Sequence, residues 1–556
     1  MNLVAALLLV VCDTQAAPPS ALDAARPFDA AALAPPGVTL YLHVEGGADL
    51  RARLADRPIA RWARSVLAGG EVGRAWGELT AATRLDAAGL FDACLGRRAT
   101  LLIRQREQAV EWAVVTEIDP DQITQILVRL KPRVLGPRHQ TAMLELPEQE
   151  LVLARRGRLL IVGPQGRSEL FEEVIDRLHQ PQQPSLAADP SIVEARGLGP
   201  GRMGLFVRHE LPMGGWSAAV ADWRAGRVDV RHIARFENPP FTGRPPEAEW
   251  DRSVLDVFEE QVVVAFAEPT ETGAGLLEAF LQASLGQAAI GEALRAQLGP
   301  RRITAVGDRD GRLHDPPFDL LYPTVARLYE IKAPAAAAER VAEQVAEQVA
   351  EQADSQMVEV VLALNRLGQA KERVNFHLDV PDLALFAPGR PRSVDLAPAA
   401  RWLLGDWPVA STVSLNWTVV TAPRESWLIV ATEPQLLTEM ARTITQRPAA
   451  APKLGRWANC GTLTGRRLAW QLRSLSEQAA VFAPPPDVDV FREVVLTLSE
   501  LADGVERCRW QLGRPSVDSM RLDAEIILSP PVSSELFRAL RSGLRPSPRS
   551  GTAAPE

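Results

Sequence analysis

The sequence lacks the local motifs that mark most enzymes. It holds no GxSxG, HExxH, phosphate-binding P-loop or complete strand–GxGxxG–helix dinucleotide fingerprint, so none of the enzyme classes recognised by those patterns is predicted. The seven histidines (43, 139, 179, 209, 232, 314 and 377) include no pair at i, i+4 spacing that could hold a metal from one helix. We therefore predict no catalytic, cofactor-binding or metal-binding residue and no cofactor.

Lysine is scarce, and positive charge does not cluster. Of the 61 Lys and Arg residues only Lys131, Lys332, Lys371 and Lys453 are lysines, and the arginines are scattered among 69 acidic residues. A phosphate-binding surface gathers its positive charge on one face. We therefore expect no nucleic-acid partner.

Long hydrophobic runs are absent beyond the first residues. The apolar run at 3–11 has the length of a signal-peptide core and is too short to span a bilayer. It predicts a signal peptide at 1–16 and a periplasmic or extracellular protein without a transmembrane helix in the mature chain. In a rival interpretation, residues 9–12 form a lipobox, and Cys12 carries a lipid that anchors the protein to the envelope.

Cysteine is also rare, and cleavage after Ala16 would leave Cys94, Cys460 and Cys508. An exported protein can form disulfides, but an odd count leaves one thiol over. Spacing does not choose the pair, and Cys460 with Cys508 is slightly favoured because both fall in one predicted domain. Buried free thiols are the favoured interpretation.

One segment of the sequence occurs twice. Residues 160–178 (LIVGPQGRSELFEEVIDRL) and 526–544 (IILSPPVSSELFRALRSGL) align without a gap. Each reads as an aliphatic strand, a Pro-containing turn and an amphipathic helix that Ser168 would cap in the first copy. We predict that the shared Ser-Glu-Leu-Phe, at 168–171 and 534–537, is a helix start and not an active site.

Looser copies of this unit and its neighbours predict the fold class. Strand–turn–helix units recur at 112–130, 262–285 and 427–444, and hairpins at 218–236 and 505–528, with turns at Gly226 and Gly513, close the two halves. We predict an α+β fold of two related tandem domains, with antiparallel or mixed sheets and helices mainly on one face. The predicted boundaries are a signal peptide at 1–16, an Ala/Pro-rich linker at 17–34, a first domain at 35–237, a linker at 238–247, a second domain at 248–545 and a disordered tail at 546–556.

Three Val-Ala-Glu-Gln tetrads at 341–352 predict a helix inserted near 335–355 of the second domain. A four-residue period overshoots the helical turn, so the valines spiral around the helix. We therefore expect a solvated helix or helical linker.

The stretches at 35–62 (PPGVTLYLHVEGGADLRARLADRPIARW), 85–103 (LDAAGLFDACLGRRATLLI) and 185–195 (SLAADPSIVEA) resemble an uncharacterised bacterial family of exported proteins, known as a domain of unknown function. The resemblance is best over 35–237. It implies export and a repeated α+β fold, and it carries over no functional residue.

A few single residues invite a functional interpretation. His43 alternates with Tyr41 and Glu45 on a strand, which predicts a solvated polar face rather than a ligand. The loop at 307–315 faintly resembles a calcium loop but has too few oxygens, so a hairpin turn is favoured. Asn416 lies in a glycosylation sequon within a strand pattern, and core packing is favoured for Trp62, Trp76, Trp402 and Trp407.

Two functions remain open. We expect an exported, non-enzymatic binding or scaffold protein of the bacterial cell envelope, with an envelope protein or ligand as its unknown partner. The alternative is an envelope hydrolase whose site assembles from residues distant in sequence, because catalytic triads are defined by geometry and not by spacing.

Overall fold

The fold is taken from a computed structural model of the whole chain. The residues that it describes are 26–54, 57, 77–78, 80–106, 109–139, 141–166, 168–209, 214–224, 226–239, 248–251, 262–269, 296–307, 324–332, 339–367, 375–377, 391–395, 414–422, 425–446, 453–482 and 487–530. The predicted signal peptide with Cys12, most of the 238–247 linker, the second Ser-Glu-Leu-Phe at 534–537 and the tail lie outside these residues.

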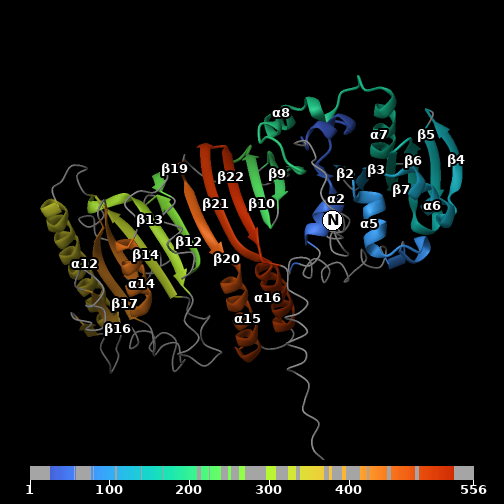
Figure 1. Ribbon diagram of the computed structural model, residues 1–556. Helices are drawn as coiled ribbons and strands as arrows, with labels where there is room; N and C mark the ends of the chain where they lie inside the picture. Colours follow the sequence, from blue (N-terminus) through green and yellow to red (C-terminus); the bar gives the residue numbers. More distant parts are fainter. Residues whose placement is uncertain are drawn as a thin grey trace, which may run out of the picture.

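All but two of the described strands belong to one antiparallel sheet, shown across Figure 1. The strands of its N-terminal half are β1 (Leu40–Glu45), β2 (Arg98–Arg106), β3 (Ala109–Glu117), β4 (Arg133–Arg138), β5 (Thr141–Leu146), β6 (Leu151–Arg156), β7 (Leu159–Pro164), β8 (Met203–Arg208), β9 (Trp216–Arg224) and β10 (Arg227–Arg235). Those of its C-terminal half are β12 (Val262–Pro269), β13 (Leu298–Gly307), β14 (Thr324–Ile331), β15 (Asn375–His377), β16 (Arg392–Asp395), β17 (Ser414–Ala422), β18 (Glu425–Ala431), β20 (Asn459–Thr464), β21 (Val505–Ser516) and β22 (Ser519–Leu528). Strands β11 (Ala248–Asp251) and β19 (Lys453–Trp457) pair separately.

The pairings place the strands in one continuous order. The N-terminal half runs β4-β5-β6-β7-β3-β2-β1-β8-β9-β10. The C-terminal half continues as β22-β21-β20-β12-β13-β14-β18-β17-β16-β15. The two halves meet where β10 pairs with β22 along nine residues of each strand. The prediction of an α+β fold built on antiparallel sheet is confirmed.

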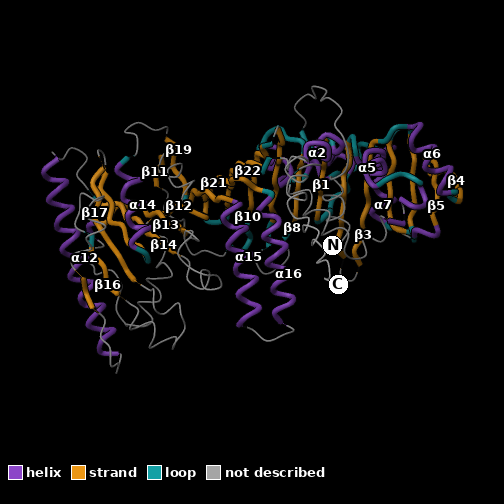
Figure 2. The backbone as a smooth tube through the Cα atoms, turned by 60° about the horizontal axis from the view of Figure 1, so that its bottom comes forward, coloured by secondary structure: helices purple, strands orange, loops and turns teal. Residues whose placement is uncertain are grey.

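Helices cover both faces of the sheet. They are η1 (Asp29–Leu33), α2 (Gly47–Leu54), α5 (Ala87–Leu95), α6 (Pro120–Leu130), η2 (Pro147–Gln149), α7 (Glu169–His179), η3 (Leu186–Ala188), α8 (Pro190–Arg196), α12 (Glu339–Leu367), α14 (Pro434–Thr445), α15 (Gly465–Phe482) and α16 (Asp487–Asp503). Helices α15 and α16 form a hairpin that extends away from the strand ends (Figures 1 and 2), held in part by the Ser499 hydroxyl donating to the Ala469 carbonyl at 3.0 Å.

The expectation that helices lie mainly on one face is wrong. On what we call the α7 face, α7 packs on residues such as Val115. On the opposite face, called the α5 face, α5 packs on the neighbouring Val114. In the C-terminal half, α14 and α12 likewise pack on opposite faces. The reason lies in strands such as β2, where Leu101 and Leu102 are both buried: a strand buried on both faces is continuously apolar and does not alternate.

Helix α7 begins where the sequence predicts. The Ser168 hydroxyl accepts a hydrogen bond from the Phe171 amide at 3.3 Å, which satisfies one unpaired N–H of the first turn. Leu170 and Phe171 are buried against the α7 face. The prediction that Ser-Glu-Leu-Phe begins a helix is confirmed for the first copy of the repeated segment.

Residues 26–34 are not a linker. Phe28, Ala31 and Ala34 are buried in the core beneath α7, and the Tyr41 hydroxyl donates to the Pro27 carbonyl at 2.5 Å. Residues 26–34 cover the side of β1 that the alternating pattern of Tyr41, His43 and Glu45 predicts to be exposed to solvent. Tyr41 and His43 are therefore buried, at 0% and 3% exposure, and the prediction of a solvated face is wrong.

Helix α12 is solvated on one side only. Ala346, Val349 and Ala353 lie on one side of it, at i, i+3 and i+7, and pack on the α5 face of the C-terminal half. Asp354 accepts hydrogen bonds from the Trp417 indole at 2.9 Å and from Arg392 at 3.0 Å. The valines spiral as expected, but the alanines between them keep the buried stripe apolar.

The hairpin β21–β22 turns later than predicted. The register shifts between Gly513 and Ser516, and the strands pair again at Ser516 with Ser519. Pro515 cannot donate to a ladder, which accounts for a bulge here instead of the turn.

Candidate ligand-binding site

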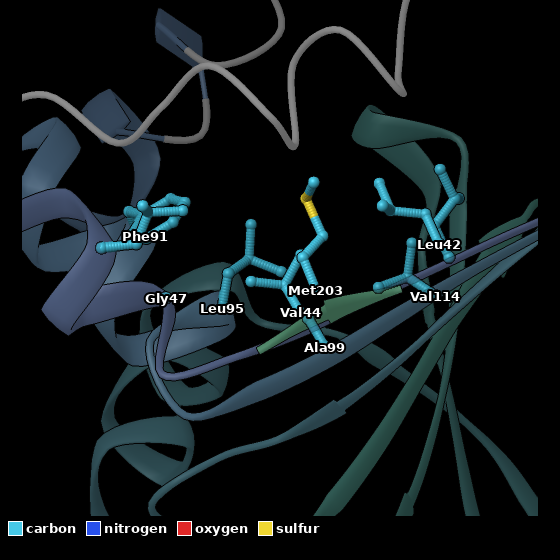
Figure 3. Close-up of a pocket in the computed structure, with 10 residues that line it drawn as sticks. Leu42, Val44, Gly47, Phe91, Leu95, Ala99, Val114 and Met203 are labelled. Atoms are coloured by element: carbon cyan, nitrogen blue, oxygen red, sulfur yellow. The ribbon is translucent and has the colours of Figure 1, made fainter. Parts of the chain in front are cut away.

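An apolar pocket lies between helices α2 and α5 and the α5 face of the N-terminal half (Figure 3). Phe91 and Leu95 of α5 face the hollow from one side, and strand residues form its floor. The lining comprises Leu42 and Val44 from β1, Ala99 and Leu101 from β2, Val114 from β3, Met203 from β8, Gly47 and Leu50 from α2, and Phe91 and Leu95 from α5. No lining side chain bears a hydroxyl, amide or charged group.

Close approach of the two helices shapes the pocket. A Cβ on Gly47 would lie 2.4 Å from the Leu95 carbonyl oxygen, so a larger residue would push α2 away from the end of α5. Arg51, which is 5% exposed, donates to both carboxylate oxygens of Asp92 at 2.8 and 2.5 Å and ties the helices together. The Asp49 carboxylate accepts from Arg53 at 2.9 Å and also from Arg202 beside β8.

The pocket encloses about 30 Å³ and opens to the surface. This exceeds the roughly 10–15 Å³ that a cavity needs to hold one water molecule, but the lining side chains offer such a water no hydrogen bond. The pocket can therefore hold the end of a thin apolar group, whose transfer from water is favourable.

A second hollow, of about 220 Å³, lies between residues 26–29 and the loop after α8. Its charged residues are surface groups: Arg196 is 39% exposed and pairs with Asp29, 62% exposed, at 3.8 Å. Water can solvate these charges, so this hollow contains no buried group that requires a ligand.

Comparison with known proteins identifies no family. No family model and no curated protein sequence matches the chain. Crystal forms I and III of TP0453, a Treponema protein, resemble it at TM-score 0.26 and 12% and 13% identity. The match covers 40% of this chain and 82% and 83% of TP0453. Crystal form IV matches at TM-score 0.24 and 12% identity, over 37% of this chain and 79% of TP0453. This is a distant likeness.

His43 lies outside the pocket, on the α7 face. Its Nδ1 is 2.8 Å from the Thr100 hydroxyl, and burial lowers the pKa of His43 to about 4, so the ring is neutral at pH 7. At the outer end of the sheet, the rings of His139 and His179 are 5.4 Å apart, and Nε2 of His139 is 3.3 Å from Asp176. Within the described ranges, no three His, Cys, Asp or Glu side chains gather in a way that could hold a metal.

The cysteines are free in the described part of the chain, and the favoured pair, Cys460 with Cys508, is not joined. Cys460 lies opposite Gln511, whereas Cys508 lies opposite Leu463. Positions 460 and 463 differ by an odd number along β20, so the two thiols are on opposite faces of the sheet. Burial raises the pKa of both Cys94 and Cys460 to about 12, which keeps these thiols protonated and unreactive.

The remaining singled-out residues are not brought to the pocket. Asn416 is fully buried in β17, and its amide donates to the Ser414 hydroxyl at 2.9 Å and to the Ala431 carbonyl at 3.3 Å, so it is inaccessible to glycosylation. Residues 308–315 and Trp62, Trp76, Trp402 and Trp407 lie outside the described residues. Among the described helices, none combines the length and apolar character needed to cross a bilayer.

Sequence reasoning missed the pocket residues. Leu42, Leu101 and Val114 read as ordinary core positions, because an apolar strand residue gives the same signal whether a helix or a hollow lies above it. Gly47 at the start of α2 was the one local hint, since glycine permits a close backbone approach.

Proposed function

We propose that the chain is a non-enzymatic, exported binding protein of the bacterial cell envelope, and that its α5-face pocket binds an apolar group. The observation that carries the proposal is the lining: ten residues without a polar side chain, open to the surface. Such a site has no group that could transfer a proton or attack a bond, but it favours apolar surface. The signal-peptide pattern at 1–16 and the resemblance to exported proteins support the location.

Dye binding tests the pocket. The methyl ester of trans-parinaric acid is a neutral dye with a thin polyene chain that fluoresces in apolar surroundings, and we expect saturable binding to the mature chain. Ala99, 7% exposed on the pocket floor, is the position to fill: Ala99→Phe should weaken binding about tenfold or more, since it occupies the space of the ligand. Ala142→Phe, at an exposed position of β5, is the matched control and should bind normally.

Two outcomes would count against the proposal. Equal dye binding by wild type and Ala99→Phe would place the dye elsewhere. Hydrolysis of an acyl ester by the wild-type protein, lost in Ala99→Phe, would support the envelope hydrolase. N-terminal sequencing of protein from its source cell tests export, and an intact Met1 on cytoplasmic protein would contradict it.

We also propose that the two halves are copies of one ancestral unit. In support, each half has the same strand order when counted inward from its outer edge, with β1 to β10 matching β12 to β18 and β20 to β22. Helices α7 and α14 follow the equivalent strands β7 and β18 and pack on the same face. The core clusters of each half contain only residues of that half, so residues 26–239 alone should unfold cooperatively in urea. A non-cooperative transition would contradict this proposal.

A further inference from the structure

Helix α16 carries exposed apolar side chains along one side. Phe491, Val494 and Leu498 are spaced i, i+3, i+7 and are 44%, 53% and 46% exposed. Val495 and Ser499, on the side that packs against α15, are only 4% and 0% exposed. We call the three exposed residues the α16 stripe, and they lie on the projecting hairpin of Figures 1 and 2. A helix with apolar residues on two adjoining sides is suited to two packing neighbours, and the described part of the chain leaves the α16 stripe exposed.

The last described residues lie at the base of α16. The Ser529 amide donates to the Gly504 carbonyl at 3.0 Å, and the Ser529 hydroxyl donates to the Asp503 carbonyl at 2.6 Å. Pro530, the last described residue, therefore lies beside the end of α16 that meets the sheet. Leu498 is five residues from Asp503 along the helix, which is about 7.5 Å. The chain that follows Pro530 thus starts within a few residues' reach of the α16 stripe.

The sequence after Pro530 has an apolar pattern that matches the stripe. Residues 534–544, which lie outside the described residues, contain the second Ser-Glu-Leu-Phe and predict an amphipathic helix. Within them Phe537, Leu540 and Leu544 repeat the i, i+3, i+7 spacing of the α16 stripe. Helices that pack side by side meet along apolar residues with this spacing. A helix of eleven residues is about 16 Å long, which is enough to cover the stripe.

Charge favours the same occupant over a second copy or an anionic lipid surface. The α15–α16 hairpin holds six acidic residues and four arginines, which include the paired Asp503 and Arg473. Residues 531–549 hold four arginines and one acidic residue, Glu535. Net charges of opposite sign attract, whereas two copies of the hairpin, or the hairpin and an anionic lipid surface, carry charge of the same sign and repel.

We propose that residues 534–544 form a helix that docks on the α16 stripe and completes a three-helix bundle with α15 and α16. The docked helix starts at the sheet and runs antiparallel to α16, and the contact removes apolar surface of both helices from water. The facing pairs are Leu498 with Phe537, Val494 with Leu540, and Phe491 with Leu544. This contact involves none of the residues that line the α5-face pocket, so it does not rest on the proposed binding function.

Limited proteolysis of the full mature chain tests the docking. An arginine-specific protease cleaves after Arg541, and it requires local opening of a docked helix. Val494→Lys places a charge in the contact and should speed this cleavage about tenfold or more, because it removes a buried apolar side chain. Glu493→Lys is the matched control: it adds the same side chain at a neighbouring exposed position, about 100° around the helix. It should be cleaved at the wild-type rate.

Disulfide trapping tests the arrangement of the two helices. Val494→Cys combined with Leu540→Cys should form an intramolecular disulfide on mild oxidation, because facing residues bring their Cβ atoms close together. Glu493→Cys combined with Leu540→Cys is the control and should form far less. Mass spectrometry of the digested protein identifies the linked peptides. Val494 and Glu493 are both exposed, so the substitutions should leave the helix content in far-UV circular dichroism unchanged.

Equal cleavage rates after Arg541 in wild type and Val494→Lys would overturn the proposal, as would equal disulfide yields in the two double-cysteine variants. A dimer by light scattering that Val494→Lys converts to monomer, with unchanged cleavage after Arg541, would assign the α16 stripe to a second copy of the chain. Sedimentation with phosphatidylcholine vesicles that Val494→Lys abolishes, again with unchanged cleavage, would assign it to a lipid surface. Either result would overturn the docking of residues 534–544.

Discussion

The indole ring of Trp510 lies directly over Gly461 of the neighbouring strand, where a Cβ would come within 2.1 Å of the ring. The two residues are opposite each other in the β20–β21 pairing. The indole nitrogen of Trp510 donates to the Asn459 side-chain oxygen at 2.8 Å, which fixes the ring in this position. Glycine is therefore required at position 461 for steric reasons, although it weakens a strand.

Gly461→Ala should lower the free energy of unfolding by about 1–3 kcal/mol, because the ring must move to admit a methyl group. Urea titration measures the change. In a Trp510→Ala background the same substitution should cost much less, and equal costs in both backgrounds would show that the contact does not matter. Gly77→Ala, at an exposed position with open space around it, is the control.

Ser168 and Phe171 should contribute to stability in different amounts. Ser168→Ala removes the cap of α7 and should cost about 1 kcal/mol. Phe171→Ala leaves a cavity beneath the helix and should cost about 3 kcal/mol or more. Chemical denaturation gives both values. Loss of ligand binding in Ser168→Ala without any change in stability would instead indicate a functional serine.

His43 should make stability depend on pH. Its pKa is about 4 in the folded chain and 6.5 in the unfolded one, so the unfolded chain takes up the proton first as pH falls. The contribution is fully present above pH 6.5 and is lost as pH falls toward 4. His43→Gln should therefore reduce the loss of stability between pH 7 and pH 4.5 by about 2 kcal/mol.

Unfolding curves at both pH values, compared with those of a variant at the 48%-exposed His139, measure this effect. If His139→Gln changed the pH dependence as much as His43→Gln does, burial of His43 would not be its source.

Asp354 should hold α12 on the sheet. Its carboxylate accepts from Trp417 and Arg392, and the Arg392 and Asp354 side chains are only 14% and 22% exposed. Asp354→Ala removes the acceptor of both hydrogen bonds and should cost about 2 kcal/mol of unfolding free energy. Glu351→Ala, one turn earlier at an exposed position of the same helix, should cost little. Equal effects would mean that α12 is only loosely attached.

Local structure was predictable from the sequence. The Ser168 cap, the turn at Gly226 and the helix around 339–353 each follow from residues that lie within a few positions of one another. Such features depend on capping, backbone freedom and periodicity, which operate over one or two turns. The prediction of a turn at Gly513 is wrong because the strand accommodates Pro515 in a bulge. Whether a bulge or a turn forms at such a position depends on the partner strand.

The sequence by itself determined that the chain forms α+β structure, with strand–turn–helix units and apolar strands suited to burial. Only the tertiary structure decided what covers each strand. Tyr41 and His43 are buried because residues 26–34 pack over them, and Cys460 and Cys508 are separated because the register places them on opposite faces. The pocket arises from pairings between residues as distant in sequence as Val44 and Met203. A strand's pattern records which side chains are apolar, but its partner and register are set by energies summed over the whole sheet.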